Sequence, residues 1–407
     1  MSIMQLFERS GALPDVLPYG SFIGEGICEL RGLGIMQGFR MRGPSPETYS
    51  PMEIALARDQ LARAMVHLNA GDMVQFIQHR DPAPAPKIKQ SPYRAANLVH
   101  QELLEQFKAE HYWLTPCELY LTHQYETVVK SWMEALMVTR RTGQVQVREE
   151  ALARYALQRF DAYENSARAG VTLERMDSTE MFQSLLRCVT YHDYPALLPG
   201  PEVPLNEVIG AERLVGGYAP YINGYHLRPI VITLYPTETV PQTLAALQID
   251  GGRLTISARF ICMDTHGFQA ELQNKKRDWN RTDFRGWTGV IRSWIAREKP
   301  EPNQDIVDQL AELDTAEAHA ASGQTFGWRT ATVIVRDEDE ERAELRVRDI
   351  INACHSMGIM ARPEDFHALD AVFGSYPGNG WSNKRRPIVT ADNFADLVMP
   401  ASHWEGA

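Results

Sequence analysis

The sequence predicts an α+β fold with mixed sheets and flanking helices, arranged as two similar α+β subdomains. Three observations favour this fold. Hydrophobic residues make up 44% of the 407 positions, strand-like and helix-like periods alternate along the chain, and the order of elements occurs twice. A chain of this length usually forms two or three domains. We expect a first subdomain at residues 1–200, a second at 201–370, and a linker at 371–407.

The elements of the first half follow from hydrophobic spacing and turn residues. Ile54, Leu61 and Met65 recur at helical spacing, whereas Leu119 and Leu121 alternate with polar residues as in a strand. The expected elements are a hairpin at 26–42, a helix at 51–69, a strand at 73–78, a helix at 95–110, a strand at 118–125 and a helix at 145–168.

The second half repeats that order after a Pro- and Gly-rich join at 195–204. Its expected elements are strands at 213–221 and 225–235, a short helix from 241, a strand at 253–263, helices within 265–322, a strand at 327–335 and a helix at 340–357.

Composition excludes several classes of protein. A net charge of -11 argues against a general nucleic-acid coat, although a local basic patch remains compatible with it. The five cysteines are far apart and lack a C-x-x-C pair, which is typical of reduced thiols in a cytosolic protein. The longest apolar runs are strand-sized, so any membrane association is expected to be peripheral.

Motifs for nucleotide, metal and nucleophile chemistry are missing from the sequence. No glycine is followed by lysine, so the phosphate-binding P-loop is absent, and no cofactor or metal site is expected in this chain. The glycines at 32, 34 and 38 are spaced as in a hairpin turn. Four histidines lie near aromatic or acidic residues, an ordinary setting for partly buried imidazoles: His111, His123, His192 and His226.

A basic and aromatic segment at 275–299 is the first candidate interaction surface. It contains eight basic residues against three acids, with tryptophans spaced so that they share one side of a helix. The segment could dock nucleic acid, anionic lipid or an acidic partner. An amphipathic helix that buries its indoles explains the same pattern and is favoured. The candidate residues are Arg277, Trp279, Arg281, Arg285, Trp287, Arg292 and Trp294.

The last forty residues carry the most specific pattern, including an F-G-x-x-P-G-N element, an Asn/Arg/Arg-Pro run and a closing Trp-x-G. This segment resembles the one ahead of the P-loop in the large ATPases of type IV secretion and conjugation, the CagE/TrbE/VirB family. Weaker similarities run through the chain at 17–44, 228–239, 259–279 and 358–364. The matching residues of the closing segment are Phe373, Gly374, Pro377, Gly378, Asn379, Asn383, Arg385, Arg386, Pro387, Asn393, Ala395, Pro400, His403, Trp404 and Gly406.

The resemblance implies a docking and assembly domain of such an ATPase, at the cytoplasmic face of the bacterial inner membrane. Residues 371–407 would lead toward a RecA-like motor that is absent from this chain, where ATP and Mg would bind, so the chain alone is expected to be inactive. The implied partners are further copies, as a hexamer or another homo-oligomer, small inner-membrane subunits and other secretion ATPases, without direct nucleic-acid binding. Candidate surface residues in the closing segment are Lys384, Arg385 and Arg386.

Two alternatives come from other classes of protein. The first is a free-standing hydrolase or transferase with a carboxylate site built from Glu118, Asp193 and Glu238. The second is a nucleic-acid-handling module that uses segment 275–299, whose binding would weaken steeply with salt.

Overall fold

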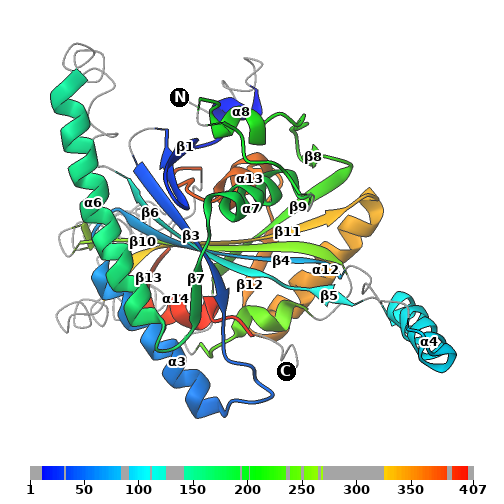
Figure 1. Ribbon diagram of the computed structural model, residues 1–407. Helices are drawn as coiled ribbons and strands as arrows, with labels where there is room; N and C mark the ends of the chain where they lie inside the picture. Colours follow the sequence, from blue (N-terminus) through cyan, green and yellow to red (C-terminus); the bar gives the residue numbers. More distant parts are fainter. Residues whose placement is uncertain are drawn as a thin grey trace, which may run out of the picture.

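Strands from both halves of the chain build one sheet (Figure 1). The computed structural model describes residues 12–31, 34–83, 91–110, 112–124, 142–192, 195–200, 202–234, 239–248, 252–264, 267–268, 325–382 and 387–401. The described elements up to residue 192 are α2 (Leu13–Val16), β1 (Tyr19–Gly24), β2 (Ile27–Leu30), β3 (Gly34–Arg42), α3 (Pro51–Ala64), η1 (Met65–His67), β4 (Asp72–Pro82), α4 (Arg94–Glu110), β5 (Trp113–Leu114), β6 (Cys117–Gln124), α6 (Thr142–Ala167), β7 (Thr172–Arg175) and α7 (Ser178–Thr190).

The later elements follow a similar order. They are α8 (Leu205–Ile209), β8 (Tyr221–Ile222), β9 (Tyr225–Leu234), η3 (Thr243–Gln248), β10 (Arg253–Cys262), β11 (Phe326–Asp337), α12 (Glu340–Ser356), β12 (Met360–Pro363), α13 (Ala368–Ser375), β13 (Ile388–Thr390) and α14 (Ala391–Val398).

The same strand topology occurs twice in this sheet. In the first half β3 lies between β7 and β6, and β4 follows β6; in the second half β9 lies between β12 and β11, and β10 follows β11. Each unit therefore has the βαββαβ order of a ferredoxin-like motif, with η3 as a short counterpart of α3. The units join where β4 pairs with β10 over eight consecutive residue pairs.

The predicted α+β class is confirmed, but the sheet is not mixed. Every strand pair among the described residues is antiparallel. In each unit a helix connects the first two strands, and the third strand lies between them and runs antiparallel to both. The two strands that the helix connects therefore do not pair with each other. The residue boundaries of the two subdomains stay a prediction.

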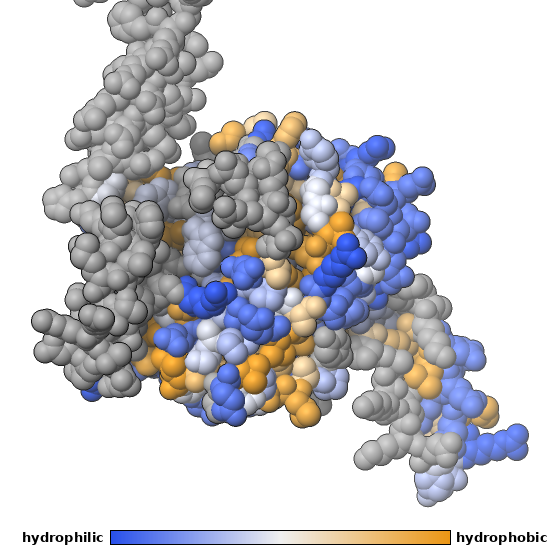
Figure 2. Space-filling view, turned by 90° about the horizontal axis from the view of Figure 1, so that it is seen from above, coloured by the Kyte–Doolittle hydropathy of each residue, from blue (hydrophilic) through white to orange (hydrophobic). Residues whose placement is uncertain are grey.

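Helices cover both faces of the sheet. On one face α3, α6, α12 and α14 pack on alternate strand residues in a core that includes Phe39, Phe160 and Phe260. On the other face α7, α8 and α13 pack over Tyr120 and neighbouring strand residues. Helix α4 extends away from the sheet (Figure 1). Seen from above, the exposed hydrophobic residues form separate groups among hydrophilic ones (Figure 2).

Two other sequence expectations need adjustment. The strand expected at 213–221 is reduced to a single bridge between Val215 and Tyr221, because Gly217 adopts a positive φ of 124° and Pro220 cannot donate a ladder hydrogen bond. The described part of 371–407 is folded onto the sheet: β13 pairs with β11, and α14 packs against α3. Its role as a lead toward a motor stays a prediction.

Candidate functional site

Most of the candidate residues from the sequence lie outside the described part of the chain. This applies to the carboxylates Asp193 and Glu238 and to the whole proposed interaction surface. The surface residues outside the described ranges are Arg277, Trp279, Arg281, Arg285, Trp287, Arg292, Trp294, Lys384, Arg385 and Arg386. Glu118 is described, and it is buried at the centre of the molecule.

A layer of polar side chains lies between the sheet and the helices α7 and α13. It arises because β4, β6 and β10 place hydrophobic residues on one face and polar residues on the other. His79 and Thr255 face each other across the junction of β4 and β10, and His79 Nδ1 lies 3.1 Å from Thr255 Oγ1. The junction is therefore bonded through side chains as well as through the backbone.

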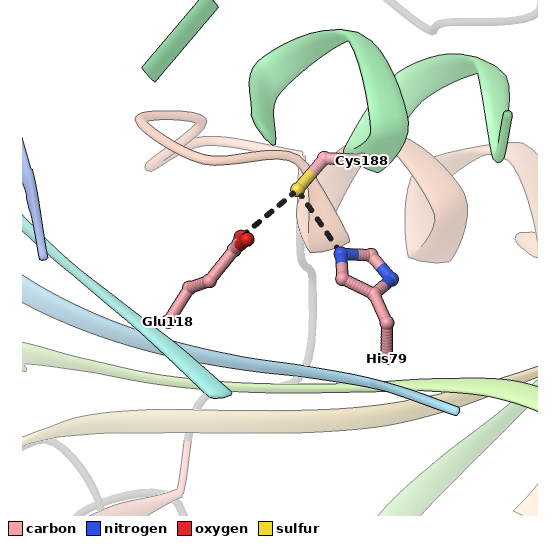
Figure 3. A group of neighbouring side chains, drawn as sticks. All are labelled: His79, Glu118 and Cys188. Carbon is pink, nitrogen blue, oxygen red and sulfur yellow. Dashed lines mark hydrogen bonds between the residues drawn. The ribbon is translucent and has the colours of Figure 1, made fainter. Parts of the chain in front are cut away.

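Three side chains with metal-binding atoms meet in this layer (Figure 3). His79 comes from β4, Glu118 from β6 and Cys188 from α7, and their ligand atoms all lie within 4.8 Å of one another. Cys188 Sγ is 3.5 Å from His79 Nε2 and 3.9 Å from Glu118 Oε2. All three side chains are buried.

Glu118 is the most heavily bonded member of this cluster. Its Oε1 atom accepts a hydrogen bond from Arg187, which also forms its ion pair, and its Oε2 accepts from Ser184 and, at 2.9 Å, from Tyr120. Arg187 and Ser184 both belong to α7, so the carboxylate fastens that helix to the sheet.

The protonation of the cluster follows from its burial. Burial, reinforced by the cations Arg187 and Arg336, holds the pKa of His79 well below its usual value. Burial and the adjacent Glu118 raise the pKa of the Cys188 thiol well above its usual value. At neutral pH the imidazole and the thiol of the cluster are therefore both uncharged. The carboxyl group of Glu118 forms an ion pair with Arg187.

This arrangement favours a structural cross-link over catalysis. A reactive cysteine needs a thiolate, which the raised pKa opposes. The Cys, His and Glu donor set suits zinc, but a metal would have to displace the hydrogen bonds that already occupy Glu118 Oε2. The hydrolase alternative requires Glu118 as an active carboxylate, and the structure shows this side chain engaged in an ion pair.

The loop after α13 is bonded to the same polar layer. Gln75 Nε2 donates to the carbonyls of Ser375 and Tyr376 at 2.9 and 3.3 Å, and Ser257 Oγ also contacts Ser375 O at 3.3 Å. The fully buried guanidinium of Arg259 donates to the carbonyl of Asn379. Residues 375–379, which run from the last residue of α13 into the loop after it, are thus held by strands of both units, and we call them the closing loop.

A positive φ shapes the closing loop. Gly378 has a φ of 77°, a conformation that L side chains rarely adopt, and an added Cβ would lie 3.1 Å from Met36 Sδ. Asn379 is fully buried, and its side-chain Oδ1 accepts from the backbone of Trp381 and Ser382. The Pro-Gly-Asn stretch of the sequence pattern therefore specifies a turn that fits against the sheet.

A second buried ion pair lies at the start of β4. Asp72 is fully buried, accepts a bidentate contact from Arg159 at 2.9 and 3.0 Å, and also contacts His123. Burial raises the pKa of Asp72, but the hydrogen bonds from His123 and Arg159 outweigh it and hold the pKa below its usual value. His123, one of the four histidines considered from sequence, is thus tied to a structural carboxylate.

The other histidines have ordinary surroundings where they are described. His192 lies 6.0 Å from the ring of Tyr225, and His226 lies 5.0 Å from that of Tyr221. His111 falls outside the described residues.

Sequence reasoning missed His79, Cys188 and the helix that carries Cys188. A capping box starts this helix, because the Asp177 side chain accepts from the Glu180 backbone and the Glu180 side chain accepts in return. That D-x-x-E signal, followed by an apolar run from Met181, could have identified α7. The grouping of His79, Glu118 and Cys188 has no local signal, since it depends on strand pairing.

Comparisons with known proteins agree with the motif resemblance. Residues 290–385 match the model of the "CagE, TrbE, VirB family, component of type IV transporter system". The chain is 24% identical over 430 residues to the conjugal transfer protein TrbE of Rhizobium radiobacter, covering 100% of this chain and 52% of that protein. It is 27% identical over 253 residues to a probable conjugal transfer protein TrbE of Sinorhizobium fredii, covering 62% of this chain and 37% of that protein.

The chain is thus similar to the CagE, TrbE, VirB family in one segment and to two TrbE conjugal transfer proteins over longer stretches. The chain spans about half the length of the first of these relatives. Within the described residues, no helix is long and apolar enough to cross a membrane.

Proposed function

We propose that this chain is the docking and assembly part of a type IV secretion, or conjugation, ATPase that serves pilus biogenesis and substrate transfer. In this role it anchors the ATP-hydrolysing motor to the inner-membrane complex at the cytoplasmic face. Hydrolysis, with its ATP and Mg, is assigned to a region of the relatives that this chain does not span.

The anchored closing loop carries this proposal. The loop belongs to the segment that matches the family model, and side chains of β4 and β10 hold it at the junction of the two units. A segment fixed to both units moves with the sheet as one body. Such a connection suits a frame that holds a motor in a defined position.

The chemistry of the buried polar layer also supports a frame. Its carboxyl group forms an ion pair with Arg187, and its thiol and imidazole are both uncharged at neutral pH for the reasons given above. Buried, fully bonded groups of this kind specify packing rather than bind substrate.

Its proposed partners are further copies in a hexamer or another homo-oligomer, small inner-membrane subunits and other secretion ATPases. Large hydrophobic side chains are exposed on the described surface, including Leu197 at 94%, Tyr218 at 66% and Phe366 at 80%. The rings of Tyr218 and Phe366 form an edge-on pair 5.8 Å apart, so they present one apolar site rather than two scattered side chains.

The test is membrane fractionation of cells that produce the full-length protein with or without the other transfer proteins. We expect the protein in the inner-membrane fraction only when the other transfer proteins are present. A double variant, Tyr218→Ser with Phe366→Ser, should reduce that association, whereas Leu345→Ser, an exposed leucine on α12, should not.

ATP turnover provides a separate test of the frame. The 407-residue chain should release no phosphate from ATP above the buffer rate. Phosphate release that is lost on substituting a residue within 1–407 would contradict the proposal, as would membrane association that is equal in the absence of every other transfer protein.

A further inference from the structure

A pocket of about 360 Å³ lies where β4 and β11 end and β10 begins, beside β5 and the start of α12. Pro82 and the indole of Trp113 form part of its wall, and the guanidinium of Arg80 lies over the Trp113 ring at 4.9 Å. The volume is at the lower end of the range for small-molecule sites. Nothing in the proposed docking role requires such a pocket.

Among the described residues that line the pocket, four arginines face two carboxylates, an excess of two positive charges in a chain whose net charge is -11. Two charged residues next to the lining do not change this excess of positive charge, because the carboxylate of Asp81 and the guanidinium of Arg80 offset each other. The charged lining residues are Arg253, Arg336, Arg342, Arg346, Asp337 and Glu338.

Among the described residues, the carboxylates engage only some of the N–H donors of these arginines. Asp337 accepts from Arg342 at 2.9 Å and from Arg346, which holds both side chains beside the pocket. Arg253 is held more loosely, because its nearest carboxylate oxygens are 3.4 Å away in Glu338 and 3.9 Å away in Asp81. Each guanidinium carries five N–H donors, so all three can still donate to a ligand.

Arg336 adds a cation that is fully withdrawn from solvent. Its Nη2 donates to the carbonyls of Arg80 and Leu254, and its Nη1 lies 3.1 Å from Asp81, but its Nε has no hydrogen-bond partner among the described residues. A buried guanidinium acts through a lower effective dielectric than a surface one, which strengthens its attraction for an anion.

We propose that this pocket binds the phosphate group of a small phosphorylated molecule. All four lining cations are arginines, whose planar forks match phosphate oxygens in bidentate pairs. Arg253 and Arg346 contact the phosphate group directly, and the buried Arg336 strengthens the attraction through its positive charge. Trp113 forms the apolar wall for the portion of the ligand that carries the phosphate.

Calorimetric titration of the full chain at low salt tests this site. The probes are inorganic pyrophosphate, ATP without magnesium, and vesicles that contain phosphatidic acid, so that free phosphates and a lipid headgroup are distinguished. We expect saturable binding of one pyrophosphate per chain. Arg253→Gln should weaken it at least tenfold, about 1.4 kcal/mol, whereas Arg348→Gln, on α12 but outside the pocket lining, should leave it unchanged.

A second substitution, which is expected to tighten binding, distinguishes a direct effect on the site from a general effect on the structure. Glu338→Gln removes the carboxylate that competes for Arg253 and should tighten binding severalfold. The matched control is Glu341→Gln, which makes the same charge change on an exposed side chain outside the lining. The proposal is overturned if pyrophosphate and ATP fail to saturate at one site, if the two arginine variants bind equally, or if only vesicles bind and Arg253→Gln has no effect.

Discussion

The ion pair between Glu118 and Arg187 offers a direct measure of how firmly α7 is fastened to the sheet. The side chain of Glu118 is 3% exposed and that of Arg187 is 17% exposed. Because little water reaches either group, each charge is stabilised mainly by the other. Breaking a buried pair by removing one partner costs about 3–5 kcal/mol. Because Gln at position 118 could keep the contacts with Tyr120 and Ser184, we expect about 3 kcal/mol for Glu118→Gln.

The double-mutant cycle makes this value specific to the pair. Arg187→Met should also cost about 3 kcal/mol, because it leaves a buried carboxylate without its cation. The double variant should cost about 3 rather than 6 kcal/mol, since neither charge remains. The assay is urea unfolding followed by circular dichroism at pH 7 and constant salt.

An exposed ion pair supplies the control for this cycle. Arg40 is 52% exposed and pairs with both Glu174 and Glu180, which are 44% and 35% exposed, so Arg40→Met should cost less than about 1 kcal/mol for each of these exposed pairs. If the costs of Glu118→Gln and Arg187→Met add to within about 0.5 kcal/mol, the two side chains are not coupled and the reasoning fails.

Three further predictions concern the core and its titration. Burial depresses the folded-state pKa of His79, so its contribution to stability is present above pH 6.5 and is lost as the pH falls toward the folded pKa. Urea unfolding should therefore show that the unmodified chain loses more stability between pH 6.5 and 5 than His79→Gln does, and equal losses would refute this. Phe394→Ala should lower the free energy of unfolding by about 3–5 kcal/mol in the same assay, because removal of the fully buried ring leaves a cavity. A loss below about 1 kcal/mol would show that the core collapses to fill this cavity. Gly43→Ala would place a Cβ 2.0 Å from the carbonyl oxygen of Pro400 and should lower the melting temperature. Gly200→Ala is the control, because the nearest atom to its added Cβ is 3.4 Å away, and it should leave the melting temperature unchanged. Equal melting temperatures for the two variants would argue against the close contact of Gly43 with Pro400.

Local sequence signals predicted most of the individual elements. The helix that the pattern of Ile54, Leu61 and Met65 indicates is present as α3 and η1, and the alternation of Leu119 and Leu121 identifies β6. These predictions succeed because the spacing of hydrophobic residues reflects the geometry of a single helix or strand and does not depend on distant contacts. The repeated order of elements was likewise visible, and the strand topology of the two units agrees with it.

What the sequence could not supply depends on contacts between distant residues. Pairing of β4 with β10 brings together strands about 180 residues apart, as in the pair of Phe76 with Ala258. The same pairing determines which polar residues meet above the sheet. Cys188 gave no spacing signal because its neighbours, His79 and Glu118, come from other elements. The closing loop was recognised by its motif, yet its hydrogen bonds to Gln75 and Arg259 required the folded sheet.

The pairing of β4 with β10 has a consequence for the independence of the two units. Strands of 11 and 10 residues would each become an unprotected edge if the units were separated. Such edges invite pairing with other chains, and most residues of both strands are buried. We therefore expect each half, when produced alone, to expose a long sheet edge and to be prone to aggregation, so that the two units protect each other in the intact chain.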